Sequence, residues 1–186
     1  MGQIMDKVGE INRTILKIGD EVNGTKEITN ALISLDIANL NLAEEELEIR
    51  EYYDEKLGEN YTARMKVEQD HYLFLEYALK HKISEIEYFH KGQDISSRKF
   101  IVFSGDCINC INLLIRKDKN IMNVFMRSSD ALRLLPMDIL SCVRILYNVL
   151  NRHGEQKKPF DEINFWITSC HIYDRDLDLA NNLHND

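Results

Sequence analysis

The chain has 186 residues, of which 44% are hydrophobic, and a formal net charge of -8 at pH 7. This length corresponds to one domain with a substantial core. General nucleic-acid binding needs a broad basic face that displaces counterions, so the acidic net charge argues against that class of protein. A small basic pocket that holds one phosphate remains compatible with this charge. Apolar runs are too short to span a membrane, and the first ten residues lack the apolar core of a signal peptide.

Four cysteines are present, and their spacing does not follow a secreted disulfide pattern, which favours a reducing, cytoplasmic location. Cys107 and Cys110 form a Cys-x-x-Cys pair. A second Cys/His pair at zinc-binding spacing is missing, as is the strand-then-helix context of a redox motif. We therefore expect no metal at this pair.

Periodicity in the first half predicts alternating helices and strands. Apolar residues at helical spacing predict an amphipathic helix over 4–18, and Asn23-Gly24 is typical of a turn. The remaining elements expected here are a strand over 31–37, an acidic helix over 44–53, a helix over 71–82 and a short strand over 86–90.

The second half is more regular. Alternating apolar residues predict a hairpin of strands 111–115 and 121–126, followed by an apolar helix over 134–152 that has Pro136 in its first turn. A further strand over 163–167 and a polar helix or tail over 174–186 complete the chain. Arg127-Ser128-Ser129-Asp130 lies where the second hairpin strand meets the helix, so these side chains are expected to form a small polar or anion-binding pocket.

Several short motifs occur in the order found in the thymidylate synthase and pyrimidine nucleotide hydroxymethylase superfamily, which the chain resembles. The resemblance is specific over 91–180 and loose over 1–90, and it implies a single thymidylate synthase-like domain over 1–186. The motifs that carry it are Ser97-Arg98-Lys99, Cys107, Arg127-Ser128-Ser129-Asp130, Leu135-Pro136-Met137-Asp138 and Cys170-His171-Ile172-Tyr173.

The resemblance implies an α+β, sandwich-like fold in which a mixed β-sheet packs on a long central helix. It also implies an enzyme that transfers a methyl or hydroxymethyl group to C5 of a pyrimidine nucleoside monophosphate, with 5,10-methylenetetrahydrofolate or a related folate as the carbon donor. In this family a cysteine thiolate adds to C6 of the base, and that nucleophile corresponds to Cys107. The protein is expected to be a homodimer.

Roles for the other site residues follow from the same resemblance. Arg127 and Ser128 are expected to bind the phosphate, together with Arg98 and Lys99 from the partner subunit. Arginine suits this role because its guanidinium fork matches phosphate oxygens. Asp138 and Asp130 are expected to bind the base, and His171 and Tyr173 are expected to bind the sugar.

Asp138 stands where uracil-specific members carry asparagine. A carboxylate accepts a hydrogen bond from the exocyclic amine of cytosine, so Asp138 favours a cytidine or deoxycytidine monophosphate. The alternative is that Asp138 is an ordinary acidic residue in the first turn of a helix.

Other departures leave the activity open. Ile108 replaces the histidine that usually follows the nucleophile, Lys26 stands in a loop that carries an arginine in the family, and no motif selects Glu45, Glu46 or Glu48 as a catalytic glutamate. Cys107 is alternatively a buried structural thiol. The second function class is therefore a catalytically inactive member that binds a nucleotide or a protein partner, and a third is a structural protein unrelated to nucleotides.

Overall fold

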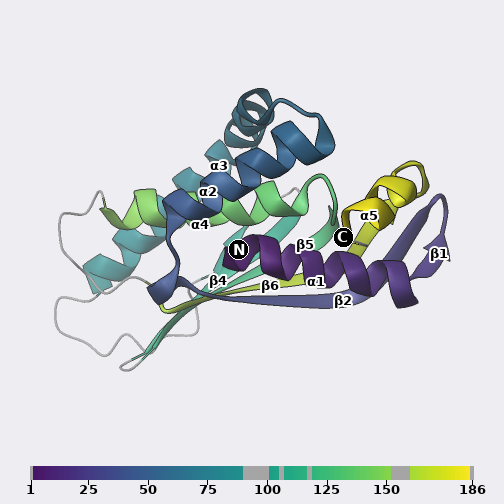
Figure 1. The fold of residues 1–186 in the computed structure, drawn as a ribbon. Coiled ribbons are helices and arrows are strands. Elements are labelled where there is room, and N and C mark those ends of the chain that lie inside the picture. Colours follow the sequence, from purple (N-terminus) through teal and green to yellow (C-terminus); the bar gives the residue numbers. More distant parts are fainter. Residues whose placement is uncertain (1, 90–100, 105–106, 117–118, 152–159, 185–186) are drawn as a thin grey trace.

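The protein is built on one mixed six-stranded sheet with its helices on one side, as the computed structural model shows (Figure 1). The structure describes residues 2–89, 101–104, 107–116, 119–151 and 160–184. The strand order is β1-β2-β6-β5-β4-β3. Strands β5 and β6 are parallel, and the other neighbouring pairs are antiparallel.

Two hairpins supply most of the sheet. Strands β1 (Asp20–Val22) and β2 (Thr25–Asp36) join through Asn23 and Gly24, both at positive φ, as a tight hairpin turn requires. Strand β4 (Ile108–Ile115) pairs with β5 (Asn120–Asp130), which confirms the predicted hairpin. The sheet is completed by β3 (Ile101–Phe103) at one edge and by β6 (Glu162–Tyr173) in the centre.

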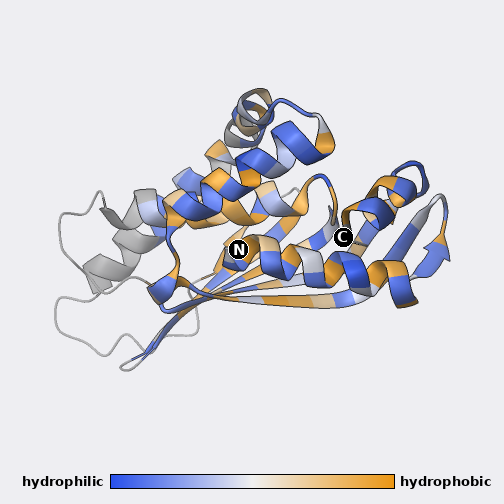
Figure 2. Ribbon diagram, in the orientation of Figure 1, coloured by the Kyte–Doolittle hydropathy of each residue, from blue (hydrophilic) through white to orange (hydrophobic). Residues whose placement is uncertain are grey.

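The helices form a single layer in which α4 is central. Helix α4 (Leu135–Asn151) is buried along nearly all of its described length, and Figure 2 shows hydrophobic residues concentrated on it. The others are α1 (Gln3–Ile18), α2 (Leu42–Glu51), α3 (Tyr61–Phe89) and α5 (Leu177–His184). A π-helical turn (Tyr52–Leu57) follows α2, and 3-10 turns lie at Ile37–Asn39 and Asp174–Asp176. The predicted α+β architecture with a long central helix is confirmed.

The predicted strand over 86–90 was wrong. A short strand was expected over 86–90, but α3 continues to Phe89, and the predicted helix over 71–82 is the middle of this 29-residue helix. Its hydrophobic residues lie on more than one side, since Tyr72, Leu75 and Leu79 are buried whereas Val67, Leu73 and Tyr77 are exposed. That pattern weakens the helical periodicity by which the full length would be recognised.

A buried carboxylate from α2 caps the start of α1. Glu45 accepts hydrogen bonds from the backbone N–H groups of Gln3 (2.7 Å) and Ile4 (2.9 Å), and Glu48 accepts one from Gly2 (2.6 Å). These satisfy donors that an isolated helix leaves unpaired. Desolvation raises the pKa of Glu45 despite these bonds.

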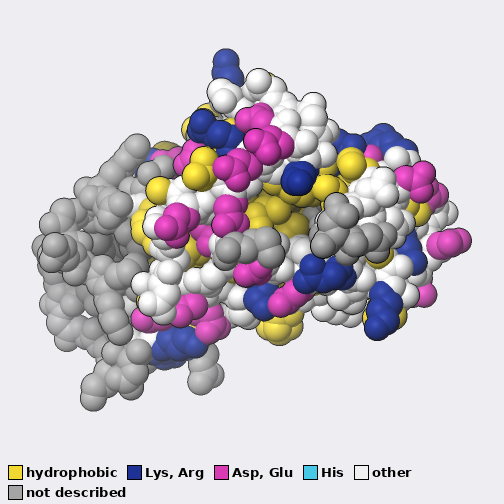
Figure 3. Space-filling model, viewed as in Figure 1, with side chains coloured by type: hydrophobic (Ala, Val, Ile, Leu, Met, Phe, Trp, Pro, Cys, Tyr) yellow, Lys and Arg dark blue, Asp and Glu magenta, His cyan; other side chains and the backbone are white. Residues whose placement is uncertain are grey.

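The sheet face opposite the helices carries an apolar row that runs across five strands. Residues in direct cross-strand register form it: Leu32, Trp166, Phe125, Cys110 and Phe103. The rings of Phe125 and Trp166 stack with their centroids 6.4 Å apart. Charged side chains, in contrast, are interspersed in both signs over the helix side seen in Figure 3.

Alternation of buried and exposed residues shifts by one residue at the same level in three strands. Buried positions are three apart at Met126 and Ser129 in β5 and at Ile167 and Cys170 in β6. In β2 the residue at this level is Asn30, which adopts φ 58 and lies between the paired residues Thr29 and Ala31. The pairing of the three strands stays one to one on both sides of this level, so they change face together and every following side chain points to the other face of the sheet. The shift therefore determines which face of the sheet each side chain points to at the ends of β5 and β6.

We predict that this shift depends on the left-handed backbone of Asn30. Asn30→Val should lower the free energy of unfolding by about 1–2 kcal/mol, because a β-branched residue resists positive φ. Asn30→Gly should cost less than about 1 kcal/mol, since glycine adopts this conformation freely. Urea denaturation of both variants measures the difference, and equal losses would contradict a conformational role.

Candidate functional site

The carboxyl ends of β5 and β6 bring four of the predicted site residues together. Because the two strands are parallel, Asp130 lies directly beside His171, and Ser128 lies beside Ser169. His171 and Tyr173 follow at alternate positions of β6, and their rings meet edge to face with centroids 5.1 Å apart. Carboxyl ends of parallel strands are where ligands commonly bind in such sheets.

Cys107 and Arg127 face each other across the β4–β5 pair. The backbone N–H of Arg127 donates to the carbonyl of Cys107 at 2.7 Å, one step beyond the paired residues Ile108 and Met126. Their strand neighbours Ile108 and Met126 are buried, whereas Cys107 is half-buried and Arg127 is exposed.

The four thiols differ in their surroundings. Desolvation raises the pKa values of Cys110 and Cys142, and it raises the pKa of Cys170 to about 12. These three thiols are therefore protonated and unreactive at neutral pH. Cys107, whose backbone carbonyl accepts from the backbone N–H of Arg127, is the better candidate for a nucleophile.

Asp138 lies in the helix layer and contacts β5 from that side. It is only 4% exposed, and it accepts hydrogen bonds from Tyr72 of α3 at Oδ1 (2.5 Å) and from Ser129 at Oδ2 (2.8 Å). Burial, together with the neighbouring carboxylate of Asp138, raises the pKa of Tyr72 well above its usual value, so the phenol remains a donor. In this conformation both oxygens of Asp138 are therefore used within the protein.

The turn between β5 and α4 is fixed by three side chains. Asp130 accepts from the backbone N–H groups of Leu132 (3.0 Å) and Arg133 (3.1 Å), while Tyr52 donates to the carbonyl of Leu132 (2.9 Å) and Tyr53 to that of Arg133. Burial raises the pKa of Asp130. This network keeps the end of β5 and the start of α4 in a defined geometry.

Beside this turn lies an open hollow of about 520 Å³, here called the charged hollow. It includes Asp130 and Tyr173 from the predicted site, and its other lining residues are Glu59, Arg64, Arg133, Leu134, Arg175 and Asp176. Arg133 is held by Asp176 at both oxygens (3.0 and 2.7 Å) and by Glu59, and the guanidinium of Arg175 lies over the Tyr173 ring, 4.8 Å from its centroid. Sequence reasoning missed these arginines because they belong to none of the recognised motifs.

Several other predicted residues are used elsewhere or lie outside the described ranges. Lys26 donates to the carbonyl of Leu16 (2.6 Å) at the end of α1. Glu46 forms an ion pair with Arg144, which lowers the pKa of Glu46, and Glu45 and Glu48 cap α1. Arg98 and Lys99 fall within 90–100, outside the described residues.

Two features are absent from the described residues. No cluster of three or more His, Cys, Asp or Glu side chains is arranged to hold a metal ion in this part of the chain. Within the same ranges, no helix combines the length and apolar character needed to cross a membrane.

Comparison with known proteins identifies the fold. No family model matches the sequence, and no curated protein matches it. The structure is similar to that of the thermostable thymidylate synthase A from Bacillus subtilis, with a TM-score of 0.62 and 14% sequence identity, over 97% of this chain and 84% of the synthase chain. The protein has a thymidylate synthase-like fold.

We predict that the Arg133–Asp176 pair stabilises the wall of the charged hollow. Hydrogen bonds from Arg133 lower the pKa of Asp176, so the contribution of this carboxylate is present above its unfolded-state pKa and is lost as pH falls through the folded-state value. Asp176→Asn should lower the free energy of unfolding by about 2 kcal/mol at pH 7. This difference from the native chain should shrink below about pH 4.

Asp174→Asn is the matched control, because Asp174 lies in the same 3-10 turn and is exposed. It should change stability by less than about 0.5 kcal/mol. Urea denaturation at several pH values makes the comparison. A constant effect of Asp176→Asn across the acid range would contradict the assigned ion pair.

Proposed function

We propose that the protein binds a pyrimidine nucleoside monophosphate at the carboxyl ends of β5 and β6 and acts on C5 of the base through Cys107. The observation that carries this proposal is the placement of Cys107 across from Arg127, with Ser128, Asp130 and His171 on the adjoining strand ends. A cationic neighbour favours the thiolate form of a cysteine. The thymidylate synthase-like fold supports the same reaction class.

Each residue has a separate proposed role. Arg127 and Ser128, with Arg98 and Lys99 of a second subunit, bind the phosphate, and His171 and Tyr173 hold the sugar. Cys107 thiolate adds to C6, forming a C–S bond and leaving a carbanion-like C5, which takes up a group or a proton. C5 then loses its original hydrogen as a proton, and the electron pair re-forms the 5,6 double bond as the C–S bond breaks. Asp138 and Asp130 orient the base, with Asp138 accepting from the exocyclic amine of cytosine.

The charged hollow is the proposed folate site, because Arg64 and Arg175 offer guanidinium groups for its carboxylates next to Asp130. When bound, such a donor supplies the one-carbon unit that C5 receives. The product, methyl or hydroxymethyl, depends on that donor.

A second function is favoured by a specific observation. Asp138 is occupied by Tyr72 and Ser129, and Glu45, Glu46 and Glu48 all serve structural contacts. A protein that binds the nucleotide without performing chemistry would keep the phosphate residues and need no nucleophile.

Tritium release separates the two functions. With CMP or dCMP labelled at C5, thiolate addition to C6 lets C5 exchange its hydrogen with water, so the native protein should release tritium without any carbon donor. Cys107→Ser should reduce the release by at least about a hundredfold. Cys110→Ser should retain it, since that thiol is protonated and its removal leaves the nucleophile in place.

Two outcomes would count against the enzyme. Undiminished release by Cys107→Ser would exclude Cys107 as the nucleophile. Nucleotide binding by the native protein without any release would favour the non-catalytic function.

The open sheet face supports a homodimer. Phe103 is 73% exposed, Leu32 48%, Trp166 45% and Phe125 38%, and their continuous row presents an apolar surface of the kind that marks an interface. A second copy related by a two-fold axis would bury this row, which agrees with a homodimer of the kind that the proposed roles of Arg98 and Lys99 require.

Phe125→Asp tests this interface. A charge in the centre of a buried apolar row should convert a dimer to a monomer at micromolar concentration, as measured by light scattering coupled to size exclusion. Val67→Asp is the control, because Val67 is a comparably exposed apolar residue on α3 (60%), and this variant should remain dimeric. A monomeric native protein, or a dimeric Phe125→Asp variant, would contradict the proposed interface.

A further inference from the structure

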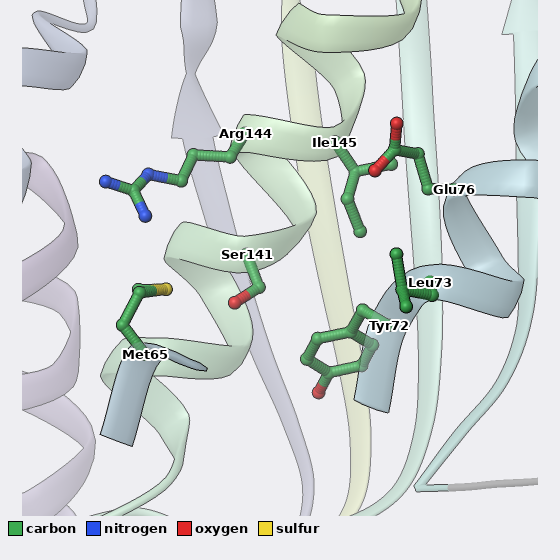
Figure 4. Close-up of a pocket in the computed structure, with 7 residues that line it drawn as sticks. All are labelled: Met65, Tyr72, Leu73, Glu76, Ser141, Arg144 and Ile145. Atoms are coloured by element: carbon green, nitrogen blue, oxygen red, sulfur yellow. The ribbon is translucent and has the colours of Figure 1, made fainter. Parts of the chain in front are cut away.

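A second cavity, distinct from the nucleotide residues, lies between α3 and α4. Its volume is about 200 Å³, and its lining comes from both helices: Met65, Tyr72, Leu73, Glu76, Ser141, Arg144 and Ile145 (Figure 4). A space of this size holds about six water molecules, or a small organic molecule of similar volume. It is too small for a nucleotide.

Ser141 presents an unsatisfied hydroxyl to this cavity. The residue is 4% exposed, and its Oγ has no hydrogen-bond partner among the described residues. A serine inside a helix usually bonds back to a carbonyl of the preceding turn, and a buried hydroxyl without a partner destabilises the fold. The hydroxyl of Ser141 is therefore available to a bound molecule.

Opposite charges flank this hydroxyl. In Figure 4 the guanidinium of Arg144 lies on one side of Ser141 and the carboxylate of Glu76 on the other. Arg144 pairs with Glu46 through one Nη atom, which leaves further N–H donors of its planar fork for another acceptor. Glu76 pairs with Lys80 along α3. The apolar side chains of Met65, Leu73 and Ile145 form the rest of the wall.

We propose that this cavity binds a small zwitterion of the α-amino acid class. The carboxylate lies against Arg144 with a hydrogen bond from Ser141, the ammonium group faces Glu76, and a short aliphatic group packs on Ile145 and Met65. A guanidinium matches a carboxylate in both charge and shape, and two opposed charges distinguish a zwitterion from a simple anion or cation. The cavity shares Tyr72 with the Asp138 contact, but its lining includes none of the proposed nucleotide-binding residues.

L-Valine is a suitable probe, with isovalerate and isobutylamine as analogues that lack its ammonium and carboxylate groups. Calorimetric titration of the full chain should show L-valine binding at micromolar to millimolar concentration, and each analogue should bind at least about tenfold more weakly. Ser141→Ala should weaken L-valine binding about fivefold through loss of one hydrogen bond. The same variant should raise the thermal midpoint of the unliganded protein, because it removes an unsatisfied polar group.

Two further variants separate the charge of Arg144 from its ion pair. Arg144→Gln and Glu46→Gln both break the pair, but Arg144→Gln should lose L-valine binding by at least about tenfold, whereas Glu46→Gln should retain it. Ser141→Val, which fills the space, should abolish binding. The proposal is overturned if L-valine does not bind, if isovalerate binds equally well, or if Ser141→Val leaves the affinity unchanged. Absence of binding would mean that the cavity holds water.

Discussion

The buried carboxylate of Asp138 joins the three parts of the structure on which the rest depends. It sits in the first turn of α4, accepts from Tyr72 of α3 and accepts from Ser129 of β5. A carboxylate that is 4% exposed is tolerated in a core when hydrogen bonds replace the lost water, and the start of a helix further favours its charge. Removing either hydroxyl would leave an undercompensated charge, so α3, α4 and the sheet are held in one relative position.

This constraint explains why the alternation of β5 shifts before its end. Ser129 reaches Asp138 because the shift in alternation after Met126 turns it toward the helices, and β2 and β6 shift at the same level. Residues beyond the shift change faces together, which is how His171 and Tyr173 come to lie beside Asp130. A structural bond in the core and the arrangement of the candidate site are thus consequences of the same backbone irregularity.

Sequence alone predicted the motifs whose members lie close along the chain. The hairpin, the polar run from Arg127 to Asp130 and the apolar helix with Pro136 follow from local periodicity, and the order of motifs indicated the fold. The sequence did not predict the hydrogen bond between Tyr72 and Asp138, because Tyr72 lies 66 residues earlier in a stretch expected only to be a helix. Arg64, Arg133 and Arg175 were missed for the same reason, because each acts through contacts made only in the folded chain.

The most direct test concerns Asp138, whose oxygens would have to serve a cytosine base as well as the core. Calorimetric titration with CMP, dCMP, UMP and dUMP should show a preference for a cytidine nucleotide in the native protein. Tyr72→Phe should bind that nucleotide several-fold more tightly, since no internal donor then competes for Oδ1, and Asp138→Asn should shift the preference toward uracil. If none of the four nucleotides binds either the native protein or Tyr72→Phe, the proposed nucleotide site is contradicted, and the thymidylate synthase-like fold serves another purpose in this chain.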